Sequence, residues 1–349
     1  MADVHPAFLS LASYLADQNY TFVCPTPESQ TRVVDKRNSS ATTRWSTTLE
    51  DFFGWSLPAK KEILTKLLSA AVLRESQETS TIIREFKDGS FKSDFRFSNL
   101  YLPHISNGET DEQNSLYYVH SAHPTKADDA VFFGPDTYFF LDFLNRANRH
   151  LSSTRPRRII DVCCGSGAGA IHMSRAHPNS NVVGLDLNPK ALQLGPVNAA
   201  LAGGRVEFLE SDLYAAVDQL GDIDVIVSNP PYIASSEDEK VPIYAAGGAQ
   251  QGLALPLRIV EEGIERLAKD GLLIIYTGVP IAYQRPGHDP FLEQMKGMKN
   301  AELMEYRIIH PDMWAEDVAR GAYTDVGRIQ VVGAVLRKSA STKRRSTHS

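Results

Sequence analysis

From Arg157 onward, short apolar segments alternate with stretches of helical periodicity, and this alternation constrains the fold more than any other feature of the chain. Apolar segments of a few residues are typical of buried parallel strands, whereas apolar residues spaced three or four apart indicate helices. Alternating strands and helices predict a doubly wound, mainly parallel sheet with right-handed crossovers. The predicted strands are 158–163, 181–186, 205–209, 222–228 and 271–277, and the predicted helices are 168–177, 189–201 and 255–269.

The last two apolar segments, Glu302–Ile309 and Arg328–Leu336, are joined by a polar loop without helical periodicity. Antiparallel strands can be joined by a loop, whereas parallel strands need a long crossover. We therefore expect a terminal antiparallel pair.

The first 127 residues follow a different pattern. Phe8–Leu15 and Leu57–Leu73 have helical periodicity, with Pro58 in the first turn of the second stretch. Strand-like segments follow at 81–86, 95–102 and 116–120. These features predict a smaller α+β domain over residues 1–127, with a winged helix as one candidate shape, followed by an α/β domain over residues 128–337.

The chain has 36 basic and 42 acidic residues, and five of the basic residues lie in its last thirteen positions. The remaining 31 basic and 42 acidic residues give residues 1–336 a net charge of −11. An acidic body disfavours nucleic acid as a partner, because nonspecific binding depends on neutralising phosphates. Residues 338–349 lack apolar periodicity and are expected to form a disordered basic tail.

Cysteine usage and hydropathy indicate the compartment. The three cysteines, Cys24, Cys163 and Cys164, cannot form a disulfide framework, because a bridge between neighbouring residues would be strained. No apolar run approaches the ~18 residues of a membrane span, and the amino terminus lacks a secretory pattern. We expect a cytoplasmic protein with no membrane contact and, in the absence of ligand-type spacing, no metal site.

A glycine loop follows the first predicted strand of the α/β domain, in the sequence Asp161-Val-Cys-Cys-Gly-Ser-Gly. Gly165 and Gly167 allow a sharp turn and close approach of a ligand to the helix amino terminus. Asp186, at the end of the next strand, can accept hydrogen bonds from ribose hydroxyls, and Asp212 follows the third strand. The G-x-G-x-G spacing favours a nucleoside such as S-adenosylmethionine over a nicotinamide dinucleotide, although the loop alone does not separate the two.

The sequence Asn229-Pro-Pro-Tyr232 follows the fourth predicted strand and should face the same crevice. Its two prolines lack N–H donors, so the Asn229 side-chain oxygen and nearby carbonyls form a set of acceptors. Acceptors without a base suit a planar NH2 group, whose nitrogen they can orient toward an electrophile. Tyr232 could pack on the face of that group.

These motifs resemble those of class I S-adenosylmethionine-dependent methyltransferases, specifically the HemK-type protein-glutamine N5-methyltransferases. The resemblance covers residues 128–337 and implies a Rossmann-like seven-stranded sheet whose last strand is antiparallel. It is carried by VFFGPDTYFFLDF (131–143), DVCCGSG (161–167), GLDLNPKAL (184–192), ESDLY (210–214), NPPY (229–232) and GGAQQGLALPLRIV (247–260).

The resemblance also implies S-adenosylmethionine as the cofactor and a protein glutamine as the methyl acceptor. The loop from Cys163 and Asp186 would hold methionine and ribose, and Asp212 and Leu213 the adenine. The implied cofactor residues are Asp161, Cys163, Cys164, Gly165, Ser166, Gly167, Asp186, Leu187, Asp212, Leu213 and Asn229, and the implied catalytic residues are Asn229, Pro230, Pro231 and Tyr232.

Alternative functions are compatible with the same residues. Asn-Pro-Pro-Tyr also suits N-methylation of a nucleic-acid base or of a small-molecule amine. A nonenzymatic nucleoside-binding scaffold subunit is a further alternative. The first 127 residues are expected to recognise the substrate.

Overall fold

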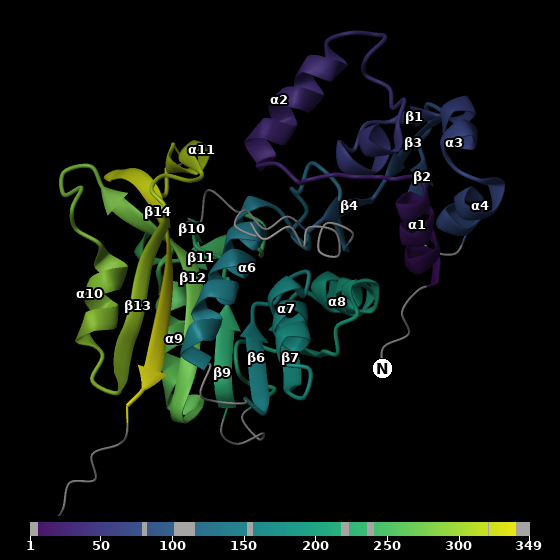
Figure 1. Cartoon of the computed structure of the whole chain (residues 1–349). Coiled ribbons are helices and arrows are strands. Elements are labelled where there is room, and N and C mark those ends of the chain that lie inside the picture. Colours follow the sequence, from purple (N-terminus) through teal and green to yellow (C-terminus); the bar gives the residue numbers. More distant parts are fainter. Residues whose placement is uncertain are drawn as a thin grey trace, which may run out of the picture.

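The computed structural model describes residues 6–78, 82–100, 116–151, 156–217, 223–235, 241–319 and 321–339. A seven-stranded sheet with the strand order β13–β14–β12–β9–β6–β7–β8 forms its centre (Figure 1). Neighbouring strands from β12 to β8 are parallel, whereas β14 is antiparallel to both β12 and β13. The strands are β6 (Arg158–Val162), β7 (Asn181–Asp186), β8 (Glu207–Glu210), β9 (Ile223–Ser228), β12 (Leu267–Ala282), β13 (Ala301–His310) and β14 (Val326–Lys338). The predicted Rossmann-like sheet and its terminal antiparallel pair are confirmed.

Helices cover both faces of this sheet, and the alternation of side chains along each strand supplies a core to each face. Ile159 and Val225 belong to the hydrophobic cluster under α6, α7 and α8, whereas Ile160 and Ile226 belong to the cluster under α9 and α10. The helices are α6 (Pro135–Ala147), α7 (Ala168–Ala176), α8 (Pro189–Ala202), α9 (Ala254–Arg266) and α10 (Pro290–Gly297).

The boundaries of α8 follow directly from its terminal residues. Asn188 caps the helix by accepting a hydrogen bond from Lys190 N at 3.0 Å, and Pro189 occupies the first helical position, where an N–H is not needed. Gly203 ends the helix in a left-handed conformation, with φ 69°. This helix packs between the sheet and the amino-terminal part of the chain.

The amino-terminal part contains a three-stranded sheet with the order β1–β3–β2. A helical turn, a strand, two helices and a hairpin follow one another in this region, and the winged-helix shape stays a prediction. The elements are a π-helix (Glu50–Gly54), β1 (Ala59–Lys60), α3 (Lys61–Leu67), α4 (Ala70–Glu78), β2 (Ile83–Glu85) and β3 (Ser90–Ser93).

The expected single helix over Leu57–Leu73 is wrong, because the chain breaks twice within it. Residues 59–60 pair with β3 as a short strand. Leu68 then leaves the helical conformation, with φ −119° and ψ 142°, and Ser69 Oγ accepts a hydrogen bond from Val72 N at 3.3 Å, which starts a second helix.

The remaining amino-terminal elements join this unit to the α/β domain. β4 and β5 form an antiparallel pair, and β5 packs on α8. Asn198 of α8 is fully buried; its side chain accepts from Val119 N at 2.7 Å and donates to Ser166 O at 2.8 Å. One continuous hydrophobic cluster therefore includes both parts of the chain. The elements are α1 (Pro6–Asp17), α2 (Pro27–Asn38), β4 (Phe95–Asn99) and β5 (Tyr117–Ser121).

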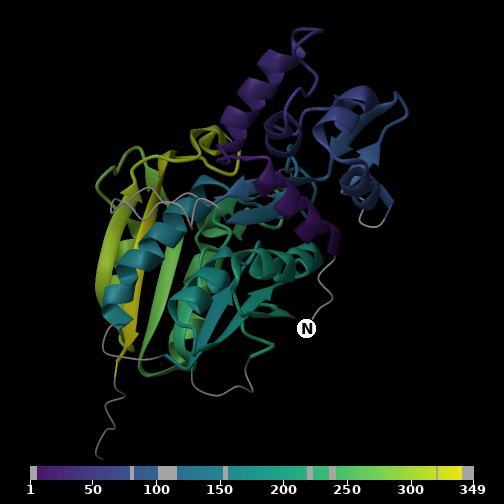
Figure 2. The ribbon, with the colours of Figure 1, turned by 45° about the vertical axis from the view of Figure 1, so that its right-hand side comes forward.

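Short elements complete the fold around the carboxyl ends of the sheet. In both views the lower end of α2 lies beside α11 (Figures 1 and 2). The structure places Lys338 in β14, whereas residues 340–349 of the expected tail lie outside the described residues. Within the described residues, no helix has both the length and the apolar character needed to cross a bilayer. The short elements are a 3-10 helix (Asn148–Leu151), β10 (Ile233–Ala234), β11 (Ala246–Gly248), a 3-10 helix (Gln250–Gly252) and α11 (Ala315–Val318).

Candidate active site

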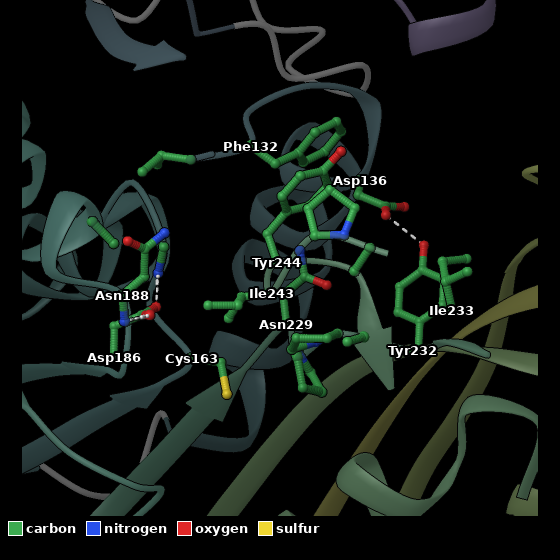
Figure 3. A pocket seen from close by; sticks show the side chains of 18 of the residues that line it. Phe132, Asp136, Cys163, Asp186, Asn188, Asn229, Tyr232, Ile233, Ile243 and Tyr244 are labelled. Carbon is green, nitrogen blue, oxygen red and sulfur yellow. Dashed lines mark hydrogen bonds between the residues drawn. The ribbon is translucent and has the colours of Figure 1, made fainter. Parts of the chain in front are cut away.

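A cavity of about 580 Å³ lies at the carboxyl ends of β6, β7 and β9, and its size is typical of a small-molecule site. Figure 3 shows side chains of Cys163, Asp186 and Asn229 around it. With the exception of Gly167, every residue that the sequence predicted for cofactor or acceptor binding lines this cavity. The structure therefore brings together motifs that lie between Asp161 and Tyr232 in the sequence.

The glycine loop has the backbone conformation that its glycines allow. Gly165 and Gly167 have φ values of 53° and 82°, in the left-handed region. A Cβ added at Gly165 would meet no heavy atom within 4 Å, so this part of the loop faces open space in the cavity. A Cβ added at Gly167 would lie 2.9 Å from the ring of Phe208, so Gly167 serves close packing behind the loop.

Asp186 ties the glycine loop to the start of α8. One carboxylate oxygen accepts from Gly165 N at 2.7 Å and the other from Asn188 N at 2.9 Å (Figure 3). Burial raises the pKa of this carboxyl, and its backbone N–H partners act in the opposite direction. Because Gly165 N and Asn188 N bind different oxygens of the carboxylate, the group keeps acceptor capacity for ligand hydroxyls.

Asp161 lies beneath the same loop and is 1% exposed. Its Oδ2 accepts a hydrogen bond from Ala170 N, in the first turn of α7, at 2.7 Å. Burial raises the pKa of this carboxyl to about 8, with a further contribution from the charge of Asp186. Asp161 is therefore mainly protonated near neutral pH, and a cation in the cavity would shift that balance.

Apolar side chains flank the loop on the side of β8. Leu187 is 53% exposed and lines the cavity together with Leu213 and the half-buried Cys163. Cys164 is buried, and a Cβ added at Gly184 would lie 3.0 Å from the Cys164 sulfur. Cys164 thus packs as a small apolar residue, whereas Cys163 faces the cavity.

Asp212 lies at the rim of the cavity. Its side chain is 62% exposed and forms a long ion pair with Arg258, at 3.7 Å. This exposure leaves its oxygens accessible to a ligand.

Asn229 is half-buried, and its side chain has no hydrogen-bond partner among the described residues. Pro230 and Pro231 line the cavity beside it. The Asn229 amide is therefore free to bind a ligand, as its place after β9 predicts.

Tyr232 is held more tightly than the sequence suggests. Tyr232 is 4% exposed, and its hydroxyl donates to Asp136 (Figure 3). The same hydroxyl accepts from Trp314 Nε1 at 2.6 Å. Burial, followed by the charge of Asp136, raises the pKa of this phenol well above its usual value. Stacking of Tyr232 on an acceptor remains a prediction, whereas its hydroxyl has a structural partner on each side.

Two glycines hold the backbone of Tyr232. A Cβ at Gly247 or at Gly252 would collide with the Tyr232 backbone, so both positions require glycine. β10, directly after Tyr232, pairs in parallel with β11. The Gly247–Gly252 segment therefore packs against the Asn229–Tyr232 loop and fixes its path.

Phe132 belongs to the 131–143 segment that carries the family resemblance, whereas several other residues in or behind the cavity were not predicted as site residues. Phe132 stacks on Tyr244, with ring centroids 5.3 Å apart and an interplanar angle of 11°. Asn188 lies two residues after Asp186, and its Asn-Pro helix start was a usable signal. Trp314 and Tyr276 carried no local signal, because only the tertiary fold brings them to Tyr232.

The amino-terminal part contributes one wall of the cavity. Pro27, Glu28 and Thr31, in the first turns of α2, line it opposite Glu316 and Asp317 of α11. Burial raises the pKa of Glu316, and the charges of Asp317 and Glu28 add to this effect. The cavity mouth is therefore acidic.

Comparison with known proteins agrees with this geometry. A family model described as a methyltransferase small domain matches residues 147–302. The strand order of the sheet is the one that the resemblance to class I methyltransferases predicts.

Named relatives of this part of the chain are glutamine methyltransferases. The chain is 32% identical over 154 residues to a release factor glutamine methyltransferase from Koribacter versatilis, an alignment that covers 42% of this chain and 53% of the relative. It is 35% identical over 129 residues to a ribosomal protein uL3 glutamine methyltransferase from Xanthomonas campestris, covering 35% and 42%. A putative protein N5-glutamine methyltransferase from Methanocaldococcus jannaschii is 34% identical over 131 residues, covering 36% and 64%.

These relatives confirm the resemblance to the HemK-type glutamine methyltransferases for this part of the chain. The chain spans about half the length of the first curated relatives that it matches.

Proposed function

We propose that this chain is an S-adenosylmethionine-dependent N-methyltransferase that acts on a planar amide nitrogen, the side chain of a protein glutamine. One observation carries the proposal: a single cavity is lined by the glycine loop with Asp186 and by the free amide of Asn229. The named relatives, which are glutamine methyltransferases, support the choice of acceptor.

The residues around Gly165 fit the proposed cofactor. The open face of Gly165 leaves room for the methionine part, and the spare acceptor capacity of Asp186 suits the ribose hydroxyls. Leu187, Leu213 and Cys163 offer apolar surface to the adenine, with Asp212 at the rim for its amine. When bound, S-adenosylmethionine would supply an activated methyl group.

Asn229 would orient the acceptor. Its side-chain oxygen can accept one N–H of the glutamine amide, and the carbonyls of the adjacent prolines offer further acceptors. An amide nitrogen is a weak nucleophile, so holding it in line with the methyl group is the main contribution that this loop can make. Phe132 and Tyr244 would border the apolar stem of the glutamine.

The amino-terminal part would select the acceptor protein, because α2 lies in the cavity wall opposite α11. Glu28, Glu316 and Asp317 give this entrance a negative charge, which favours basic residues beside the target glutamine and disfavours a polyanion. Release factors and ribosomal protein uL3, which the relatives' names specify, are the first acceptors to test. A cytoplasmic location stays a prediction from the cysteine usage.

Methyl transfer from radiolabelled S-adenosylmethionine tests the proposal. Cell lysate incubated with the protein should incorporate label that protease removes and nuclease leaves in place. Label lost to nuclease instead would support methylation of a nucleic-acid base. Cofactor binding without transfer to any lysate fraction would support a nonenzymatic scaffold.

A further inference from the structure

A buried network of four side chains lies behind the acceptor side of the cavity. Asp136, at the start of α6, is 7% exposed. One of its oxygens accepts from the Tyr232 hydroxyl and the other from the Tyr276 hydroxyl at 2.7 Å. Trp314 Nε1 donates to the Tyr232 oxygen at 2.6 Å. The network thus joins α6, the loop after β9, β12 and the segment before α11, and Figure 3 shows its Asp136–Tyr232 bond.

The donors and acceptors of this network match only when Asp136 is ionised. Tyr232 and Tyr276 both donate to the carboxylate, and Tyr232 accepts from Trp314. If Asp136 gained a proton, its own O–H group would join the O–H groups of Tyr232 and Tyr276 as a third donor. The acceptors of the network suffice for only two of these three groups, so one buried donor would lose its partner. The amino terminus of α6 and the two hydroxyls stabilise the charge, whereas Asp317 of α11 opposes it.

This network is the second of two anchors on Tyr232. The first is the backbone contact with Gly247 and Gly252, which holds the main chain on one side. The hydroxyl anchor holds the far end of the side chain on the other side. Because Asn229 precedes Tyr232 by three residues, two of them prolines with fixed φ, a movement of Tyr232 transmits directly to the Asn229 amide.

We propose that Asp136 is a positioning residue: its ionised carboxylate holds the Tyr232 hydroxyl and thereby fixes the Asn229 amide where the acceptor nitrogen must lie. The kinetic consequence rests on the proposed function, whereas the network itself does not. Burial raises the pKa of Asp136 to about 6, so the anchor weakens as the pH falls through about 6. Turnover should fall over the same range.

A double-mutant cycle tests this inference. Asp136→Asn and Tyr232→Phe should each lower kcat about 100-fold, the cost of a small misplacement of a reacting group, and leave the Kd for S-adenosylhomocysteine within about twofold. Because both act through one hydrogen bond, the double variant should equal the single variants. Tyr276→Phe, which leaves the Asp136–Tyr232 bond intact, serves as the matched control with a smaller loss. Additive losses in the double variant would overturn the inference.

The pH profile and a spectroscopic signal provide independent readouts. Wild-type kcat should fall on the acid side of about pH 6, and Asp136→Asn should lack this decline. The indole N–H resonance of Trp314, one of three tryptophans and assigned with Trp314→Phe, should titrate near the same pH in the wild type and not in Asp136→Asn. An indole signal that does not titrate overturns the inference even when no acceptor is known. Titration without methyl transfer would count against the proposed function alone.

Discussion

The two halves of the cavity are built in different ways. In the glycine-loop half, around Gly165 and Asp186, carboxylates bind backbone N–H groups of loops that directly follow neighbouring strands. In the Asn229 half, side chains bind one another across sequence separations of 96 and 140 positions, as Tyr232 and Tyr276 do with Asp136. Under the proposed function, cofactor binding in the first half would depend on local backbone geometry, whereas turnover in the second half would depend on tertiary packing. Substitutions in the two halves should therefore have separable effects.

The largest difference between the effect on turnover and the effect on cofactor binding is expected at Asn229. Asn229→Ala should lower kcat by about 10²–10³-fold, the range for loss of one preorganised hydrogen-bonding group, because the acceptor amide loses its partner. The Kd for S-adenosylhomocysteine should stay within about twofold, by isothermal titration. Asn181→Ala, an exposed asparagine at the start of β7, is the control and should change neither value. Equal loss of binding and turnover in Asn229→Ala would mean that the two halves are not separable.

Asp186 tests the opposite half. Asp186→Ala should weaken cofactor binding by roughly 10–100-fold, since hydrogen bonds to a charged group contribute about 1.5–3 kcal/mol. Asp212→Ala, at the exposed rim, should cost at most about 1 kcal/mol. Calorimetry with S-adenosylhomocysteine measures both, and a larger effect at Asp212 than at Asp186 would contradict the assignment of the ribose to Asp186.

Asp161 gives the glycine-loop half a pH dependence. Its pKa of about 8 means that the Asp161 carboxyl of the free protein carries a proton at pH 7. The positive charge of bound S-adenosylmethionine favours the ionised carboxylate, so this proton should be released on binding. Calorimetry in buffers of different ionisation enthalpy should detect release of nearly one proton at pH 7. Asp161→Asn should release none. Because the folded state raises this pKa, the contribution of Asp161 to stability is present at low pH and is lost as the pH rises toward 8.

The smallest effect is expected at the acidic entrance. Glu28→Ala should raise the KM for a basic acceptor peptide about two- to fivefold at low salt, the scale of a partly exposed charge, and should not change cofactor affinity. Glu62→Ala on the exposed side of α3 is the control. An unchanged KM in Glu28→Ala at low salt would remove α2 from acceptor recognition.

Sequence reasoning located cavity-lining residues where the geometry is local. Gly165, Asp186 and Asn229 follow strand ends, and the topology of a parallel sheet brings strand ends to one edge. It failed where distant side chains meet: nothing near Trp314 or Tyr276 indicates that the first binds Tyr232 and the second binds Asp136. It also failed at Leu68, where a periodic apolar stretch conceals two helices, because the break depends on one residue's backbone conformation.

The most direct test of the account joins both halves in one reaction. Purified protein, S-adenosylmethionine and a candidate acceptor protein are incubated, and the acceptor is digested and analysed by mass spectrometry, with Asn229→Ala in parallel. The account predicts a single added CH2 group on a glutamine side chain with the wild-type protein and none with Asn229→Ala. Methylation at another residue type, or equal methylation by both proteins, would contradict it.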